Sequence, residues 1–219
     1  MPDGHSQTIL PAKVAHKPRV VYHRVRWDTP DGDFVDLDFT APPDAWAHHN
    51  GLWVMFHGLE GSSDSHYCRA FMSRAVALGV LGVVPHFRGC SGENNRAPRA
   101  YHSGDSTEVD WIIKRLRATL PSIKSCAVVG VSLGGNVVLK WLGEQGSQAK
   151  QWVDHAASVS APVDLLAGAQ SLAKGFNRVY TRMFLSTLVP KAIEKVKRFP
   201  ALGDVDQIAG CRDFFDFDN

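Results

Sequence analysis

The sequence lacks an excess of either charge. Its 24 lysine and arginine residues face 22 aspartate and glutamate residues, which gives a formal net charge of +2. Proteins that bind nucleic acid through its phosphates usually carry a basic patch, so charge gives no indication of such a partner. Cysteine is scarce, with four widely spaced residues and no C-x-x-C pair: Cys68, Cys90, Cys126 and Cys211. This spacing favours reduced thiols in a cytoplasmic protein over a disulfide framework.

Long hydrophobic runs are missing as well. The longest, residues 75–87, is interrupted by glycine, proline and histidine and is too short to span a bilayer. The first residues (MPDGHSQ) have neither a basic start nor an apolar segment, so we expect no secretory signal. Composition is otherwise ordinary, with 44% hydrophobic and 21% charged residues. A length of 219 residues predicts one domain over 1–219 with a substantial core.

The most informative stretch is residues 125–136 (SCAVVGVSLGGN). An apolar run at 127–129 predicts a buried strand, residues 130–134 read G-x-S-x-G, and residues 137–144 favour a helix. This is the strand, turn and helix order of a nucleophile elbow, in which strain and the helix dipole favour a reactive hydroxyl on Ser132. A glycine-rich turn with an incidental serine is the alternative. A phosphate-binding loop is excluded, because the Gly-Lys-Ser/Thr ending is absent.

The rest of the chain alternates strand and helix patterns. Strand patterns occur at residues 20–27, 34–40, 52–56, 81–85 and 156–160, and helical patterns at 66–78 and 105–120. The first two strands flank a turn sequence (DTPDG) and predict an antiparallel hairpin; the later alternation predicts a parallel sheet covered by helices on both faces.

Both ends of the chain depart from this alternation. Residues 1–19 are polar with three prolines and predict an irregular arm. After residue 163 only helical segments follow, at about 163–173, 176–189 and 191–198. We interpret residues 163–199 as a helical cap over the carboxyl edge of the sheet, with a plain helical extension as the alternative.

A serine nucleophile also needs donors for an oxyanion. The backbone N–H of Leu133 follows the nucleophile directly. The loop after the 52–56 strand (HGLEG, residues 57–61) allows close backbone approach, and there we nominate the N–H of Leu59. A simple turn would also explain these glycines.

Several segments together resemble one family. They are residues 57–62 (HGLEGS), 85–93 (PHFRGCSGE), 101–105 (YHSGD) and 130–136 (GVSLGGN), with shorter matches at 4–8, 159–162 and 175–180. In these motifs the chain resembles the YheT-like α/β-hydrolases, relatives of the abhydrolase-domain esterases and lipases, almost from end to end. The resemblance implies an α/β-hydrolase fold, serine esterase chemistry on small acyl esters with Ser132 as nucleophile, and no metal or organic cofactor.

One departure from that family concerns the remaining triad members. α/β-Hydrolases carry an acid and then a histidine after the nucleophile, whereas the single histidine after Ser132 is His155, at the amino end of its strand. The family's acid and histidine lie on further strands, so we expect that these C-terminal strands are missing and that residues 1–219 form an incomplete, inactive portion of a hydrolase. Pairing of the upstream His86 with Asp164 is a second possibility. A non-catalytic relative that binds an apolar ligand or partner is the alternative function.

Overall fold

The computed structural model describes residues 3–218 and contains one six-stranded sheet with the strand order β1-β2-β4-β3-β5-β6. The strands are β1 (His23–Asp28), β2 (Phe34–Phe39), β3 (Gly51–Phe56), β4 (Leu81–Pro85), β5 (Ser125–Val131) and β6 (His155–Val159). The helices are α1 (Gly4–Val14), α2 (His66–Ala77), α3 (Ser106–Thr119), α4 (Leu133–Gln145), α5 (Leu165–Leu172), α6 (Arg178–Arg198), α7 (Val205–Ala209) and α8 (Phe214–Asp218).

The sheet has the mixed topology that the sequence predicts. β1 and β2 pair antiparallel, from His23 opposite Phe39 to Asp28 opposite Phe34, and β2 continues antiparallel onto β4. Gly32 closes the hairpin at φ 79°, a left-handed conformation that favours glycine. The pairs β3–β4, β3–β5 and β5–β6 are all parallel, so these four strands present their carboxyl ends at one edge.

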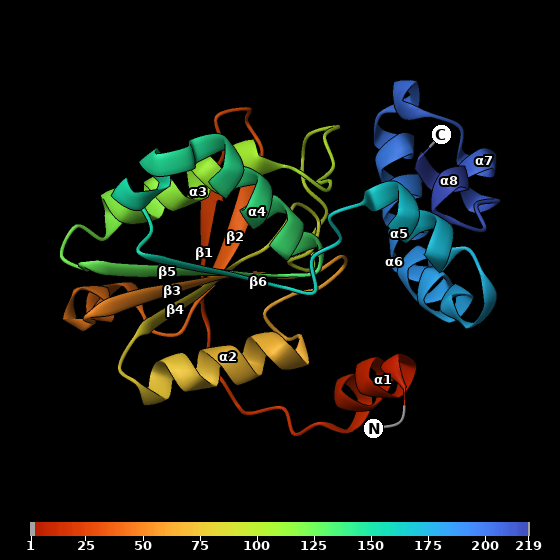
Figure 1. The fold of residues 1–219 in the computed structure, drawn as a ribbon. Coiled ribbons are helices and arrows are strands. Elements are labelled where there is room, and N and C mark those ends of the chain that lie inside the picture. The colour runs from red at the N-terminus through yellow and green to blue at the C-terminus, as the bar shows by residue number, and fades with distance from the viewer. Residues whose placement is uncertain (1–2, 219) are drawn as a thin grey trace.

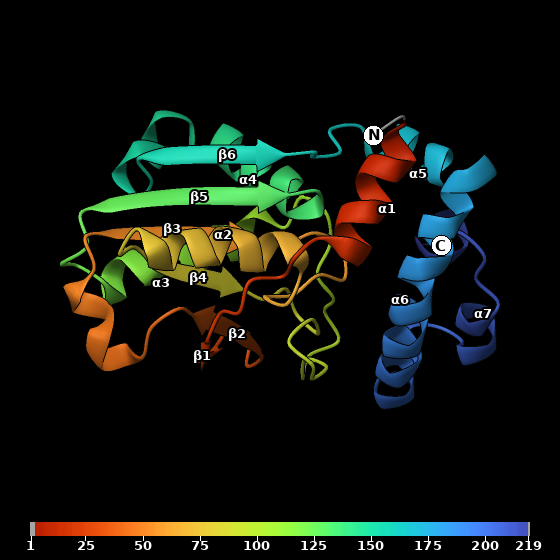
Figure 2. The same cartoon turned by 90° about the horizontal axis from the view of Figure 1, so that it is seen from below.

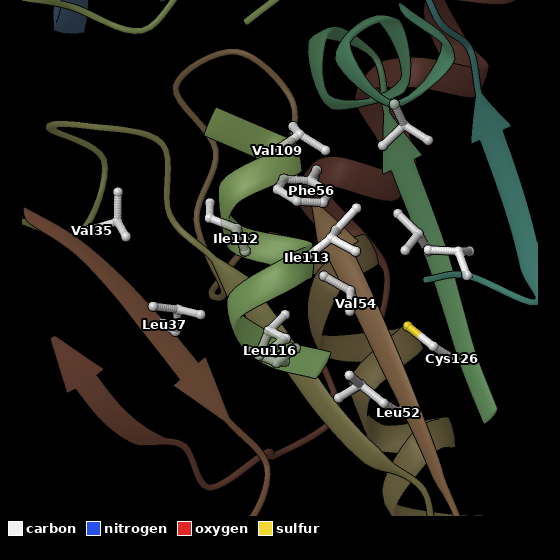
Figure 3. Close-up of a cluster of buried hydrophobic side chains, with 14 of the residues drawn as sticks. Val35, Leu37, Leu52, Val54, Phe56, Val109, Ile112, Ile113, Leu116 and Cys126 are labelled. Carbon is white, nitrogen blue, oxygen red and sulfur yellow. The ribbon is translucent and has the colours of Figure 1, made fainter. Parts of the chain in front are cut away.

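Helices cover both faces of the sheet, α2 on one side and α3 with α4 on the other (Figure 1). Figure 3 shows how α3 packs, with its apolar side chains directed at those of β2 and β3. The side chains of α3 that the sequence pattern places on one face are all buried, and they are Val109, Ile112, Ile113 and Leu116. Burial of such a face stabilises the fold by roughly 25 cal/mol for each Å² of apolar surface, which fixes α3 on the sheet.

The prediction of an irregular arm over residues 1–19 is wrong for residues 4–14, which form α1; residues 1–2 lie outside the described part. Asp3 caps this helix, since its carboxylate accepts a hydrogen bond from the N–H of Ser6 at 2.9 Å. Pro11 lies inside α1, where proline usually weakens a helix. The imidazole of His5 lies 4.6 Å from the ring of Phe176, so a contact distant in sequence helps to stabilise α1.

The C-terminal helices lie beyond the carboxyl ends of the strands (Figure 2), where the sequence places a cap. The predicted helices at 176–189 and 191–198 are one helix of 21 residues, α6, which continues through Pro190. Proline removes one backbone hydrogen bond, but strong helix formers follow it and the helix continues. In residues 3–218, no helix is both long enough and apolar enough to cross a membrane.

Candidate active site

Ser132 lies at the junction of β5 and α4, with backbone angles φ 55° and ψ −120°. Only three non-glycine residues of the described chain have a positive φ, and Ser132 is one of them. Hydrogen bonds hold the turn on both sides: the N–H of Ser132 donates to Val159 O at 2.9 Å, and its carbonyl accepts from Asn136 N at 3.0 Å. The predicted strand, turn and helix order around Ser132 is therefore present, with the backbone strain expected of an elbow.

Close backbone packing requires both glycines of the G-x-S-x-G motif, Gly130 and Gly134. A Cβ on Gly130 would lie 2.2 Å from the carbonyl oxygen of Gly134, and a Cβ on Gly134 would lie 2.2 Å from that of Phe56. Both distances are far inside van der Waals contact, and the atoms that would be hit belong to backbone. The start of α4 can approach the end of β3 only because these side chains are absent.

The loop after β3 lies against Ser132, since a Cβ placed on Gly58 would be 3.2 Å from the Cβ of Ser132. Side-chain hydroxyls fix two backbone amides of this loop: Gly58 N–H donates to Tyr67 Oη at 2.9 Å, and Glu60 N–H donates to Tyr101 Oη at 3.0 Å. The amide of Leu59 between them has no acceptor among the described residues.

The N–H of Leu133, the first residue of α4, is likewise without an acceptor in the described structure. The two amides nominated from the sequence, those of Leu59 and Leu133, are thus both available beside Ser132. Free N–H groups at a helix start and in a neighbouring loop can together stabilise a negatively charged oxygen.

His57, the first residue of that loop, is fully buried. Its Nδ1–H donates to Gly58 O at 2.8 Å, and its Nε2 accepts from Phe87 N at 3.1 Å. Burial lowers the pKa of His57 to about 3, so the imidazole is neutral near pH 7. Both ring nitrogens already bind backbone, which gives His57 a structural role.

His86 is buried as well, and its partner differs from the one considered from the sequence. Its Nε2 lies 2.8 Å from Asp38 Oδ2, and its Nδ1 lies 3.2 Å from Cys90 O. Asp164 instead caps α5 by accepting a hydrogen bond from Ala167 N at 2.9 Å. The pairing of His86 with Asp164 is therefore wrong.

Asp38 is the centre of a buried charged cluster next to the site. Burial acts to raise the pKa of its carboxyl, but hydrogen bonds from Arg24, His86 and Ser63 outweigh that effect and hold the pKa well below its usual range. Three donors satisfy the hydrogen-bonding capacity of the buried Asp38 carboxylate. The carboxylate in turn fixes the orientation of the His86 imidazole at the end of β4.

His102 and His155 are not hydrogen-bonded to Ser132 either. His102 is exposed and donates through Nδ1 to Ser103 O at 2.7 Å. His155 is the first residue of β6 and pairs with Ala127, five positions before Ser132, which corresponds to roughly 16 Å along a strand. Among residues 3–218, no hydrogen bond joins an imidazole to Ser132.

The Arg88 side chain, in the loop after β4, packs against acidic side chains and leaves no anion site. Its guanidinium donates to Glu108 Oε2 at 2.6 Å, to Asp31 Oδ2 at 2.7 Å and to Asp33 Oδ2 at 3.1 Å. Its side chain is only 3% exposed, so the five donors of the guanidinium are largely used within the protein.

Comparison with known proteins gives a consistent result. A family profile described as the alpha/beta hydrolase fold matches residues 53–207. The Escherichia coli (strain K12) protein named "Putative esterase YheT" is 40% identical over 98% of this chain and 63% of its own length. Human "Phospholipase ABHD3" is 27% identical over 99% of this chain and 53% of its own length. The chain thus spans between about half and two thirds of the length of these relatives.

Among solved structures, the Pyrococcus furiosus esterase Pf2001 superposes with a TM-score of 0.57. The aligned region covers 83% of this chain and 73% of that protein, at 17% sequence identity. At this identity the match concerns the fold alone.

Proposed function

This chain belongs to the alpha/beta hydrolase fold family, and from that premise we propose that it is a serine carboxylic-ester hydrolase. Ser132 is the proposed nucleophile, and the amides of Leu59 and Leu133 are the proposed oxyanion donors. The observation that carries this proposal is the backbone of Ser132 at φ 55° and ψ −120°, between β5 and α4. Such strain is maintained where the surrounding structure over-determines it, and it is typical of functional positions.

In the proposed reaction, Ser132 Oγ attacks the carbonyl carbon of an acyl ester and loses its proton to solvent water, since no described imidazole is hydrogen-bonded to it. The carbonyl electron pair moves to oxygen, and the resulting oxyanion accepts hydrogen bonds from Leu59 N–H and Leu133 N–H. Collapse of this intermediate breaks the bond to the alcohol, which leaves as it gains a proton. Water then attacks the acyl-enzyme, releases the acid and returns the proton to Ser132.

The proposed substrates are small acyl esters, and no metal or organic cofactor takes part in this scheme. Support for the substrate class comes from the names of the relatives, which include an esterase, a phospholipase and the yeast "Monoacylglycerol lipase". We place residues 163–199, most of which lie in α5 and α6, as a cap over the carboxyl edge. A cytoplasmic location is supported by Cys126, a free thiol that is buried within β5.

An organophosphonate probe tests the nucleophile directly. We expect a fluorophosphonate to form a bond from Ser132 Oγ to phosphorus with loss of fluoride, while the hydroxyl proton passes to solvent, because the amides of Leu59 and Leu133 can bind the phosphonyl oxygen. Labelling should be slow, since no described imidazole is hydrogen-bonded to Ser132. Intact-mass and peptide mass spectrometry would locate the adduct. A folded protein that stays unlabelled at Ser132 would favour the non-catalytic alternative, a relative that binds an apolar ligand or partner.

Turnover by the 219-residue chain is expected to be slow. Since no described imidazole is hydrogen-bonded to Ser132, catalysis would come from attack by Ser132 with the help of the oxyanion donors and substrate binding, without a general base. We expect kcat on an activated ester to lie below about 1 s⁻¹, the lower end of the usual enzyme range. A kcat within that range would mean that one of the upstream histidines acts as base, and separate His86→Ala and His102→Ala substitutions would identify it.

A further inference from the structure

We propose that Lys191 of α6 and Tyr101 position the oxyanion donor Leu59 through the carboxylate of Glu60, so that docking of the C-terminal helices completes the oxyanion site. This inference rests on the proposed function, and it assigns Glu60, Tyr101 and Lys191 as positioning residues. It begins with the backbone of Glu60, which follows Leu59 directly.

Glu60 has a φ of 54°, in the left-handed region that costs a non-glycine residue conformational energy. A glutamate is an unexpected choice at such a position, because its neighbours Gly58 and Gly61 show that glycine is available to this loop. Glu60 places the peptide unit that follows Leu59, and the hydrogen bonds of Gly58 N–H and Glu60 N–H to tyrosine hydroxyls fix the backbone on both sides of the Leu59 N–H. Contacts of the Glu60 side chain must hold this conformation in place.

Tyr101 provides the first of those contacts. Its hydroxyl accepts a hydrogen bond from Glu60 N at 3.0 Å and donates one to Glu60 Oε1 at 2.7 Å, so a single oxygen binds both the backbone and the side chain. The ring of Tyr101 stacks on that of Phe87, with centroids 5.3 Å apart and an interplanar angle of 10°. Stacking on Phe87 therefore fixes the position of the Tyr101 hydroxyl, and this hydroxyl holds the loop at Glu60.

Lys191 provides the second contact, from α6. Its Nζ donates to Glu60 Oε2 at 2.7 Å, and the side chain of Glu60 is only 6% exposed, against 34% for that of Lys191. A carboxylate withdrawn from water needs a charged partner, because unpaired burial of a charge is strongly unfavourable. Docking of α6 thus supplies the charged partner of the Glu60 carboxylate.

α6 is anchored at a second point one turn further on. The buried Nζ of Lys195 donates to Asn95 Oδ1 at 2.6 Å and to Arg99 O at 2.7 Å. Because residues four apart lie on the same face of a helix, Lys191 and Lys195 face the same loops. The position of α6 is thereby coupled to the segment that carries Tyr101 and to the loop that carries Leu59.

The test compares Lys191→Gln with Lys191→Arg and with the control Lys197→Gln, which removes an exposed lysine from the same helix. The readout is the rate of Ser132 phosphonylation by a fluorophosphonate, resolved into the limiting rate kinact and the half-saturating concentration KI. A misplaced oxyanion donor weakens binding of the transition state more than binding of the reagent. The kinact of Lys191→Gln should therefore fall about 10-fold, with KI changed less than two-fold. This loss of kinact is smaller than the loss of about 10²-fold that is typical of removing a donor itself. Arginine at 191 should restore most of kinact, and Lys197→Gln should match the wild type.

Tyr101→Phe is the second variant, since it removes both hydrogen bonds to Glu60 and keeps the stacked ring; its kinact should fall at least as far. A Lys191→Gln protein with the wild-type kinact and an unchanged melting temperature would overturn the inference while Ser132 labelling stands. An equal loss of kinact in Lys191→Gln and Lys191→Arg would also overturn the inference, and so would a rise in KI with kinact unchanged. Absence of labelling in the folded wild type would instead remove the proposed function, and this inference with it.

Discussion

Replacing Ser132 with alanine is expected to abolish acyl-enzyme formation and to reduce ester hydrolysis by this protein to the residual rate that the amides and substrate binding support. The substitution removes the proposed nucleophile and leaves the amides of Leu59 and Leu133 in position. In a complete serine hydrolase the loss of the nucleophile costs about 10⁶-fold in kcat. The amides and substrate binding remain in the variant and can retain about 10³–10⁴-fold acceleration over water, so the measured loss is the part that acyl transfer to Ser132 adds.

The measurement is the initial rate of release of a chromogenic alcohol from a short activated ester, with circular dichroism as the check on folding. Ser160→Ala is the matched control, because Ser160 is exposed and also has a positive φ, of 51°, yet lies one residue past the end of β6. We expect this control to keep the wild-type rate. A folded Ser132→Ala protein that retains more than about a tenth of the wild-type kcat would exclude Ser132 as the nucleophile.

The features that the sequence predicts well are those encoded by local pattern. The four parallel strands are short apolar runs between turn signals, and α3 presents a regular apolar face, so periodicity alone is sufficient for both. The elbow is also local, because β5, the glycines and α4 follow one another in the chain. α1 and the continuous α6 were not predicted, because each contains a proline, which usually interrupts a helix. In α1 the Asp3 cap and the contact of His5 outweigh that effect. In α6 the helix-forming residues that flank Pro190 outweigh it.

The surroundings of Ser132 depend on contacts that no local pattern encodes. Glu60 meets Tyr101 across 41 residues and Lys191 across 131 residues, so neither partner could be chosen before the fold was known. The acidic partner of His86 was misassigned for the same reason. Asp38 lies on β2, in the antiparallel hairpin, and the register of β2 on β4 brings it beside the end of β4. The sequence contains one sign of these contacts, namely a glutamate, Glu60, in a short loop that also contains Gly58 and Gly61.

Gly134→Ala is expected to destabilise the protein strongly, although it adds a single methyl group. The new Cβ would lie 2.2 Å from Phe56 O and 2.5 Å from His57 O, both backbone atoms at the end of β3. Phe56 is paired with Gly130 in the ladder of β3 with β5, so its backbone cannot move without disturbing that pairing, and α4 must shift away from the sheet. Overpacking of this kind costs about 3 kcal/mol or more, and it would displace the Leu133 N–H as well.

Gly143→Ala is the matched control for that variant, because Gly143 lies in the same helix, α4, and a Cβ there would meet nothing within 4 Å. Alanine is favoured over glycine in a helix by about 1 kcal/mol, so this control should be more stable than the wild type. Urea unfolding of both variants measures the difference, and Ser132 labelling measures the effect on the site. We expect opposite signs of the stability change, with labelling lost only in Gly134→Ala. Equal stabilisation by the two substitutions would show that α4 does not approach β3 as closely as the elbow geometry requires.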